Sequence, residues 1–194
     1  ILEIINKTIT FAFSFNNINI TIISGSARQE STTYRAALLL NNWLSNHTEH
    51  QVNIIDCRTV DLPWMEKIYT KVDEVPEHSK SIFELLFNAD AFILVTPEYN
   101  GSYSSALKNL LDHLPKQSHK VMGIVTASTG ALGGMRAAQQ MLLLCAGMFA
   151  IACPQFLLIP KVEEQINKDG FIINESFNFP FNNFIKEFLW ISEA

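Results

Sequence analysis

The chain has 194 residues and carries little charge for its length. At about 150 residues per domain, one domain is expected. Hydrophobic residues make up 48% of the chain and charged residues 17%, a composition that excludes disorder over most of it. The formal net charge of -5 comes without a block of Lys or Arg, so neither nucleic acid nor an anionic membrane surface is an expected partner.

Apolar runs and cysteines narrow the class of protein further. The longest apolar run, residues 141–153, is shorter than the ~20 residues that a membrane-spanning helix needs, so no membrane span is predicted. The three cysteines are far apart in the sequence, and neither they nor the five histidines show metal-ligand spacing. Free thiols, no metal site and a cytoplasmic location are therefore expected.

Residues 1–16 are predicted to be an N-terminal extension, and residues 17–194 a single domain. The extension mixes Ile and Phe with Asn, which differs from the basic start and unbroken apolar centre of a signal peptide. We therefore expect an added strand or another ordered extension there.

The fold class follows from an alternation of two patterns after residue 17. Short runs rich in β-branched residues indicate strands, and the longer segments between them have the apolar spacing of helices. We therefore predict an α/β fold in which a parallel sheet is covered by helices on both faces. Strands are expected at residues 18–23, 52–56, 91–95, 121–125 and 155–159, and helices at residues 33–46, 76–88, 104–114, 134–149 and 180–191.

Three loops of this predicted fold are candidate binding loops. Ligands of open parallel sheets bind beyond the carboxyl ends of the strands, where the strand order reverses. The first loop (residues 24–33), the second loop (96–102) and the third loop (126–134) lie there and are rich in Gly, Ser and Thr. A longer segment, residues 58–74, contains Leu-Pro-Trp and is a further candidate functional loop.

The first loop runs straight from a strand into a helix. Backbone N–H groups at a helix N-terminus suit the oxygens of a terminal phosphate. Arg28 adds a planar cation, and the hydroxyls of Ser26, Ser31 and Thr33 add further donors. The alternative is that Ser31 or Thr32 simply caps the helix, since Ser and Thr are favoured at that position. Capping alone explains neither the glycine nor the arginine of this loop.

The second loop presents consecutive backbone N–H and C=O groups beside the ring of Tyr99. Such groups can hydrogen-bond the polar edge of a flat heterocycle. The alternative is a tight turn that only closes a strand, given the pair Asn100-Gly101. The nucleotide fingerprints G-x-G-x-x-G and G-x-x-x-x-G-K-[ST] and the hydrolase motif G-x-S-x-G do not occur in the sequence.

Together these motifs resemble the NADPH-dependent FMN reductase family. The family's patterns are similar to G-S-x-R-x-x-S at residues 25–31, P-E-Y-N-G-S at 97–102, L-K-N-x-x-D at 107–112 and G-G-x-R at 133–136. Residues 62–64 resemble its Leu-Pro-aromatic segment. The resemblance implies a flavodoxin-like three-layer sandwich whose five-stranded parallel sheet has the strand order 2-1-3-4-5.

The resemblance also implies FMN as the cofactor and NADPH or NADH as the co-substrate. No catalytic acid, base or nucleophile is expected, because the cofactor carries the chemistry; a general base at Glu98 is the alternative. The expected cofactor-binding residues are Ser26, Arg28, Ser31, Thr32 and Thr33 around the phosphate, Pro97, Glu98, Tyr99, Asn100 and Gly101 along the flavin ring, and Ser128, Thr129 and Gly130 in the third loop.

The activity implied is transfer of a hydride from nicotinamide to FMN and on to a quinone, a flavin or a similar small acceptor. Trp64, Tyr103 and His113 are expected to shape the acceptor pocket. Two other functions stay open: a flavodoxin-type electron carrier, and a flavin-binding protein without enzymatic activity. Arg28 and the modest net charge argue against the carrier.

The helical segment at residues 135–149 is apolar almost all round its second half. A helix needs such a surface only when it is buried on more than one side. We therefore expect a subunit interface there, in line with the homodimers and homotetramers that the family resemblance implies.

Overall fold

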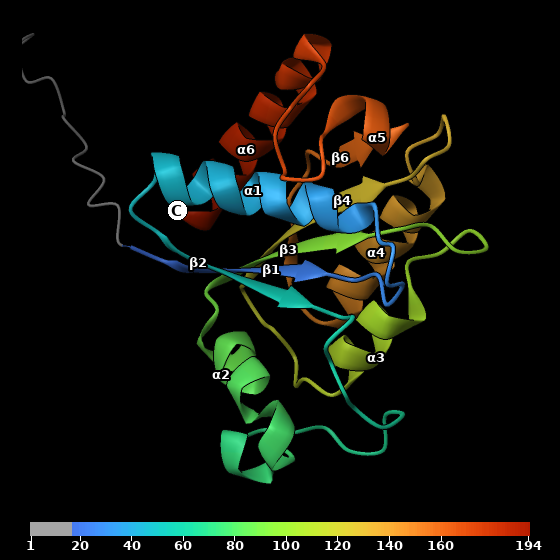
Figure 1. Cartoon of the computed structure of the whole chain (residues 1–194). Helices are drawn as coiled ribbons and strands as arrows, with labels where there is room; N and C mark the ends of the chain where they lie inside the picture. The colour runs from blue at the N-terminus through green and yellow to red at the C-terminus, as the bar shows by residue number, and fades with distance from the viewer. Residues whose placement is uncertain (1–16) are drawn as a thin grey trace, which may run out of the picture.

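The described part of the chain, residues 17–194, forms a parallel sheet between two layers of helices in the computed structural model (Figure 1). The predicted extension, residues 1–16, lies outside the described residues. Within residues 17–194, no helix has both the length and the hydrophobicity to cross a bilayer.

The sheet has the strand order β2-β1-β3-β4-β5, and β6 also pairs with β4. This order confirms the prediction. The central strands β1, β3 and β4 consist almost wholly of buried residues, because helices cover both faces of the sheet. The strands are β1 (Asn19–Ser24), β2 (Gln51–Asp56), β3 (Ala91–Thr96), β4 (Val121–Ala127), β5 (Ile151–Ala152) and β6 (Leu157–Ile159).

The last predicted strand, at residues 155–159, is present as the shorter β6, whereas β5 before it was not predicted. β5 pairs with the start of β4 and ends at Ala152, and β6 pairs with the end of β4 and begins at Leu157. Pro154 lies between β5 and β6 and has no N–H group to donate to a sheet. The edge of the sheet is therefore interrupted at the proline and resumes beside the third loop.

Helices cover the two faces of the sheet unequally. α1 and α6 pack on one face, and α2, α3 and α4 pack on the other (Figure 1). All five predicted helices are present with shifted ends, whereas α5 was not predicted. The helices are α1 (Thr33–His47), α2 (Lys80–Asn88), α3 (Ser105–Asp112), α4 (Met135–Gly147), α5 (Val162–Gln165) and α6 (Asn178–Ser192), with 3₁₀ turns at Val72–Glu74, Glu77–Ser79 and Glu175–Phe177.

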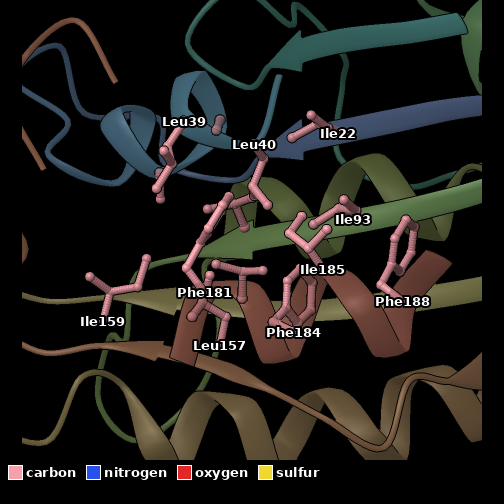
Figure 2. Packing of buried hydrophobic residues seen from close by; sticks show 14 of the residues in the cluster. Ile22, Leu39, Leu40, Ile93, Leu157, Ile159, Phe181, Phe184, Ile185 and Phe188 are labelled. Carbon is pink, nitrogen blue, oxygen red and sulfur yellow. The ribbon is translucent and has the colours of Figure 1, made fainter. Parts of the chain in front are cut away.

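The core between α1, α6 and the sheet is built from large apolar side chains (Figure 2). Leu40 of α1 and the rings of Phe184 and Phe188 of α6 are fully buried there. Gly123 on β4 makes room for these rings, because a Cβ atom at this position would lie 2.9 Å from Phe184 Cζ. Burial of each such side chain contributes about 1.5–3 kcal/mol. The loops at the carboxyl edge therefore start from a rigid sheet.

Candidate functional site

The candidate site lies at the carboxyl edge of the sheet, where β1 and β3 run side by side. Gly25, directly after β1, donates its N–H to the carbonyl of Val95 in β3 at 2.7 Å. The carbonyl of Gly25 accepts from the hydroxyl of Ser104, which also caps α3 by accepting from Leu107 N at 3.1 Å. A Cβ atom at position 25 would lie 2.9 Å from Leu107 Cβ. Only glycine therefore allows the first loop, β3 and α3 to meet.

The N-terminus of α1 carries no side-chain cap. Thr32 occupies the cap position, yet its side chain makes no capping hydrogen bond. The hydroxyl of Ser31 is buried and has no partner among the described residues. The capping role considered for these two residues is therefore wrong. The N–H groups and the positive end of the α1 dipole are left available to an anion.

Arg28 extends from the first loop beside this helix end. Its side chain is exposed, and its guanidinium makes no ion pair or hydrogen bond within residues 17–194. Its backbone N–H donates to Ser26 Oγ at 3.4 Å, and Ser26 Oγ lies 3.5 Å from the hydroxyl of Tyr99. The first and second loops thus meet at a pair of hydroxyl groups, next to a free cation.

The second loop forms a tight two-residue turn. Tyr99 and Ser102 exchange two backbone hydrogen bonds, of 2.9 and 3.1 Å, and φ is 52° at Asn100 and 81° at Gly101. This is a type I′ turn, which the Asn-Gly pair favours. The tight turn considered from the sequence is therefore present. Within residues 17–194, the N–H groups of Asn100 and Gly101 donate to no other backbone group, so they remain available to a ligand.

Glu98 anchors the second loop to α4. Its Oε2 accepts from the backbone N–H of Arg136 at 3.1 Å, and its Oε1 accepts from Arg136 Nη1 at 3.0 Å. The carboxylate therefore caps the positive end of α4, where Gly134 has a φ of 84°. Arg136 was not among the predicted site residues. The G-G-x-R motif contains it, but the sequence does not show that it faces Glu98.

The third loop is fixed beside the other two by the strand β6. The N–H of Ser128 donates to the carbonyl of Ile159 in β6 at 3.0 Å. The hydroxyl of Ser128 in turn accepts from Gly130 N at 3.0 Å, and the carbonyl of Gly130 accepts from Lys161 N at 3.1 Å. β6, the edge strand that follows Pro154, therefore positions the third loop.

The three loops enclose one small pocket with a volume of about 110 Å³. Three predicted residues, Asn100, Gly101 and Gly130, lie outside its lining, whereas Glu30 and Ala127 line it without having been predicted. The predicted residues that line the pocket are Ser26, Arg28, Ser31, Thr32, Thr33, Pro97, Glu98, Tyr99, Ser128 and Thr129.

Comparison with known families matches residues 18–164 to the family described as NADPH-dependent FMN reductase. The chain belongs to this family. FMN is accordingly its cofactor, and NAD(P)H is its electron donor. An FMN-dependent NADPH-azoreductase of Staphylococcus aureus is 29% identical to this chain over 159 residues, which span 80% of this chain and 84% of the relative.

Solved structures share the fold of this chain. FerB from Paracoccus denitrificans, a flavoenzyme NAD(P)H:(acceptor) oxidoreductase, has a TM-score of 0.70 at 20% identity, covering 91% of this chain and 98% of FerB. The apo form of the NADH:FMN oxidoreductase EMOB has a TM-score of 0.64 at 21% identity, covering 90% and 89%. A flavodoxin variant from Pseudomonas aeruginosa has a TM-score of 0.56 at 16% identity, covering 90% and 99%. The flavodoxin-like fold is therefore confirmed.

The three side chains expected to shape an acceptor pocket lie in different environments. Trp64 is 77% exposed. Tyr103 is half-buried, and this burial raises the pKa of its hydroxyl. His113 is completely buried, with its ring stacked on that of Tyr69 at 5.4 Å and its Nδ1 atom 2.8 Å from the carbonyl of Asn109. The expectation for His113 is therefore wrong, because the end of α3 turns this ring inward.

Replacing Ser104 with alanine should lower the free energy of unfolding of the protein by about 1–3 kcal/mol, because α3 loses its cap and a buried carbonyl loses its donor. Chemical denaturation followed by circular dichroism measures the change. The matched control is Ser105→Ala, at an exposed position, which should change the free energy by less than about 0.5 kcal/mol. Equal stabilities of the two variants would contradict the role assigned to Ser104.

Proposed function

We propose that the chain is an FMN-dependent NAD(P)H oxidoreductase whose first loop binds the FMN phosphate and whose second and third loops bind the flavin ring. The acceptor is a small molecule such as a quinone, a free flavin or an azo compound. The observation that carries the proposal is the uncapped N-terminus of α1, with the unpartnered hydroxyl of Ser31, at the pocket between the three loops. The azo compound is included because of the name of the Staphylococcus aureus relative.

The first loop fits a phosphate dianion in charge and in donors. Buried hydroxyl groups in proteins nearly always have a hydrogen-bond partner, and a phosphate oxygen would supply one to Ser31. The dipole of α1 and the free guanidinium of Arg28 favour a negative charge at the same place. Ser26, Thr32 and Thr33 line the same pocket, and their hydroxyl groups give further donors.

The second and third loops fit the flat ring. The N–H groups of Asn100 and Gly101 are free to donate to polar atoms at its edge, and they would stabilise negative charge on the reduced ring. Ser128, Thr129 and Gly130 would contact the cofactor from the third loop. When bound, FMN supplies the redox chemistry, taking a hydride from NAD(P)H and passing two electrons to the acceptor.

The proposal includes no catalytic side chain. Glu98 was considered as a general base, but both of its carboxylate oxygens accept hydrogen bonds from Arg136. This arrangement supports a positioning role, in which the ion pair fastens the second loop to the start of α4. The chain's own contribution is to bind and orient the reactants.

The second candidate is a flavodoxin-type electron carrier, because a flavodoxin shares the fold. The unpaired cation of Arg28 in the first loop and a net charge of only -5 support the enzyme instead. A flavin-binding protein without enzymatic activity is the third candidate. One assay separates the enzyme from both of these candidates.

Purified protein supplied with FMN, NADPH and a quinone should oxidise NADPH through many turnovers, because the bound flavin is reduced and reoxidised in each cycle. The loss of nicotinamide absorbance measures the rate. If the protein bound FMN but did not oxidise NADPH, one of the other two candidates would be supported in place of the enzyme. Protein that stays colourless after FMN addition and desalting would contradict every flavin function.

Arg28→Ala should weaken FMN binding by about 1.5–3 kcal/mol, the size of a hydrogen bond to a charged group. Titration of flavin fluorescence measures the dissociation constant. Lys186→Ala is the matched control, since Lys186 is an exposed cation on α6 that does not line the pocket between the three loops. An unchanged dissociation constant in Arg28→Ala would remove Arg28 from the phosphate site.

We also propose that the chain forms a homodimer or homotetramer through α4. Leu142 and Leu143 of α4 are exposed, the latter by 68%. Leu143 and Leu144 line a groove of about 560 Å³ between α3 and α4, together with Met65 and Ile68 from the loop after β2. Exposed apolar side chains gathered along one groove are typical of an interface, and a second copy of the chain would cover them.

Leu143→Glu should convert the assembly to monomers at micromolar concentration, because the interface would have to bury an unpaired charge. Light scattering after size-exclusion chromatography measures the mass. Phe179→Glu is the control, since Phe179 is 74% exposed on α6, away from this groove. A monomeric mass for the unaltered chain would contradict the interface.

The cytoplasm is the proposed location. All three cysteines, Cys57, Cys145 and Cys153, are buried and unpaired. Unpaired thiols persist in a reducing compartment, which supports this location.

A further inference from the structure

A further cavity, which we call the adjoining cavity, opens directly beside the pocket of the three loops. Its volume of about 330 Å³ is in the range of small-molecule sites, whereas the pocket of the three loops, at about 110 Å³, is smaller than that range. Glu30, Ser31 and Thr32 line both spaces. The two spaces therefore meet at the uncapped N-terminus of α1, where the FMN phosphate is proposed to bind.

Three cations line the adjoining cavity, and one of them is unpaired. Arg58 pairs with Asp56, and Arg35 Nη2 lies 3.0 Å from Glu163 Oε1. The third cation, Lys168, is exposed and makes no ion pair or hydrogen bond within residues 17–194. An anionic group that entered this cavity would therefore gain a cation that no carboxylate already holds.

One wall of the adjoining cavity is a stack of Arg58 on Tyr34. The guanidinium carbon of Arg58 lies 4.3 Å from the centre of the Tyr34 ring. Nε of Arg58 donates to Asp56 Oδ2 at 2.7 Å, and its Nη1 donates to the carbonyl of Gln29 at 3.3 Å, so the guanidinium is held in place. Bases of nucleotides stack on aromatic rings and on guanidinium planes. The wall is thus preorganised for a flat base.

We propose that the adjoining cavity binds the adenylate half of FAD, so that the chain accepts FAD as well as FMN. In FAD, the phosphate of FMN is bonded directly to a second phosphate that carries adenosine. A first phosphate beside Ser31 therefore brings the second one to the boundary that the two spaces share. The inference rests on the proposed function, because the adenylate reaches this cavity only when the first loop holds the flavin phosphate.

The residues of the adjoining cavity match the parts of an adenylate. The ammonium group of Lys168 attracts the added phosphate, and the stack of Arg58 on Tyr34 contacts the adenine. Glu30 is exposed at the shared boundary, and its carboxylate suits the hydroxyl groups of the ribose, which acidic side chains accept from in dinucleotide sites. Each part of the ligand thus has a partner of suitable chemistry.

The test compares the dissociation constants of FAD and FMN for the flavin-free protein, measured by titration calorimetry. Without contacts to the adenylate, FAD should bind more weakly, because its first phosphate carries one negative charge where the terminal phosphate of FMN carries nearly two. Contacts in the adjoining cavity should compensate for this loss, so FAD should bind at least as tightly as FMN. Weaker binding of FAD than of FMN would overturn the inference.

Lys168→Ala should raise the dissociation constant of FAD about fivefold, the effect of losing one exposed ion pair. The dissociation constant of FMN should stay unchanged, because Lys168 does not line the pocket of the three loops. The matched control is Lys186→Ala, which removes an exposed cation from α6 and should change neither constant. Unchanged FAD binding in Lys168→Ala would contradict a phosphate in the adjoining cavity.

Tyr34→Leu should raise the dissociation constant of FAD about tenfold, because a base loses its stacking surface. Tyr34→Phe keeps the flat ring and should bind FAD as the unaltered protein does. Both variants should bind FMN normally, since Tyr34 does not line the pocket of the three loops. Equal affinities of Tyr34→Leu and Tyr34→Phe for FAD would refute the stacking role.

FMN binding and NADPH oxidation by the FMN-loaded protein test the proposed function separately. If the protein binds FMN and oxidises NADPH, but binds FAD more weakly than FMN, only the adenylate site is overturned. If it binds neither flavin, the proposed function and this inference are both overturned.

Discussion

The contact of Gly25 with β3 and α3 is the constraint on which the site depends. Its N–H bonds to the carbonyl of Val95, its own carbonyl accepts from Ser104, and a side chain at this position would collide with Leu107. The contact lies where the strand order of the sheet reverses, so it fixes the first loop relative to the second loop and α3. The pocket of the three loops takes its shape from this contact.

Another cavity, of about 430 Å³, lies on the other side of the first loop from the pocket of the three loops. One side has the helix end, the hydroxyl groups and the unpaired Arg28, all of which suit a phosphate. The other side has the thiol of Cys57 and the amide of Asn109, which holds the backbone of Pro63 and Met65.

The low charge of the chain is explained by where its apolar residues lie. β3 and β4 are buried along their whole length because helices cover both faces, so they contain apolar residues at nearly every position. α4 adds exposed leucines beside the groove that it shares with α3, as the apolar pattern of residues 135–149 had indicated. One of the few charged pairs near the site, Glu98 with Arg136, connects a loop to a helix end.

The sequence by itself determined the α/β class, the strand order through the family motifs, and the three loops that meet at the site, because these depend on local patterns of apolar residues, glycines and hydroxyls. Tertiary structure alone decided the extra strand β5 before Pro154, the pairing of Arg136 with Glu98 and the inward turn of His113. It also left Ser31 and Thr32 without a capping role. Each of these features depends on which groups, far apart in the chain, face one another in the fold. The spacing of residues along one segment does not encode the direction of side chains across a packed sheet.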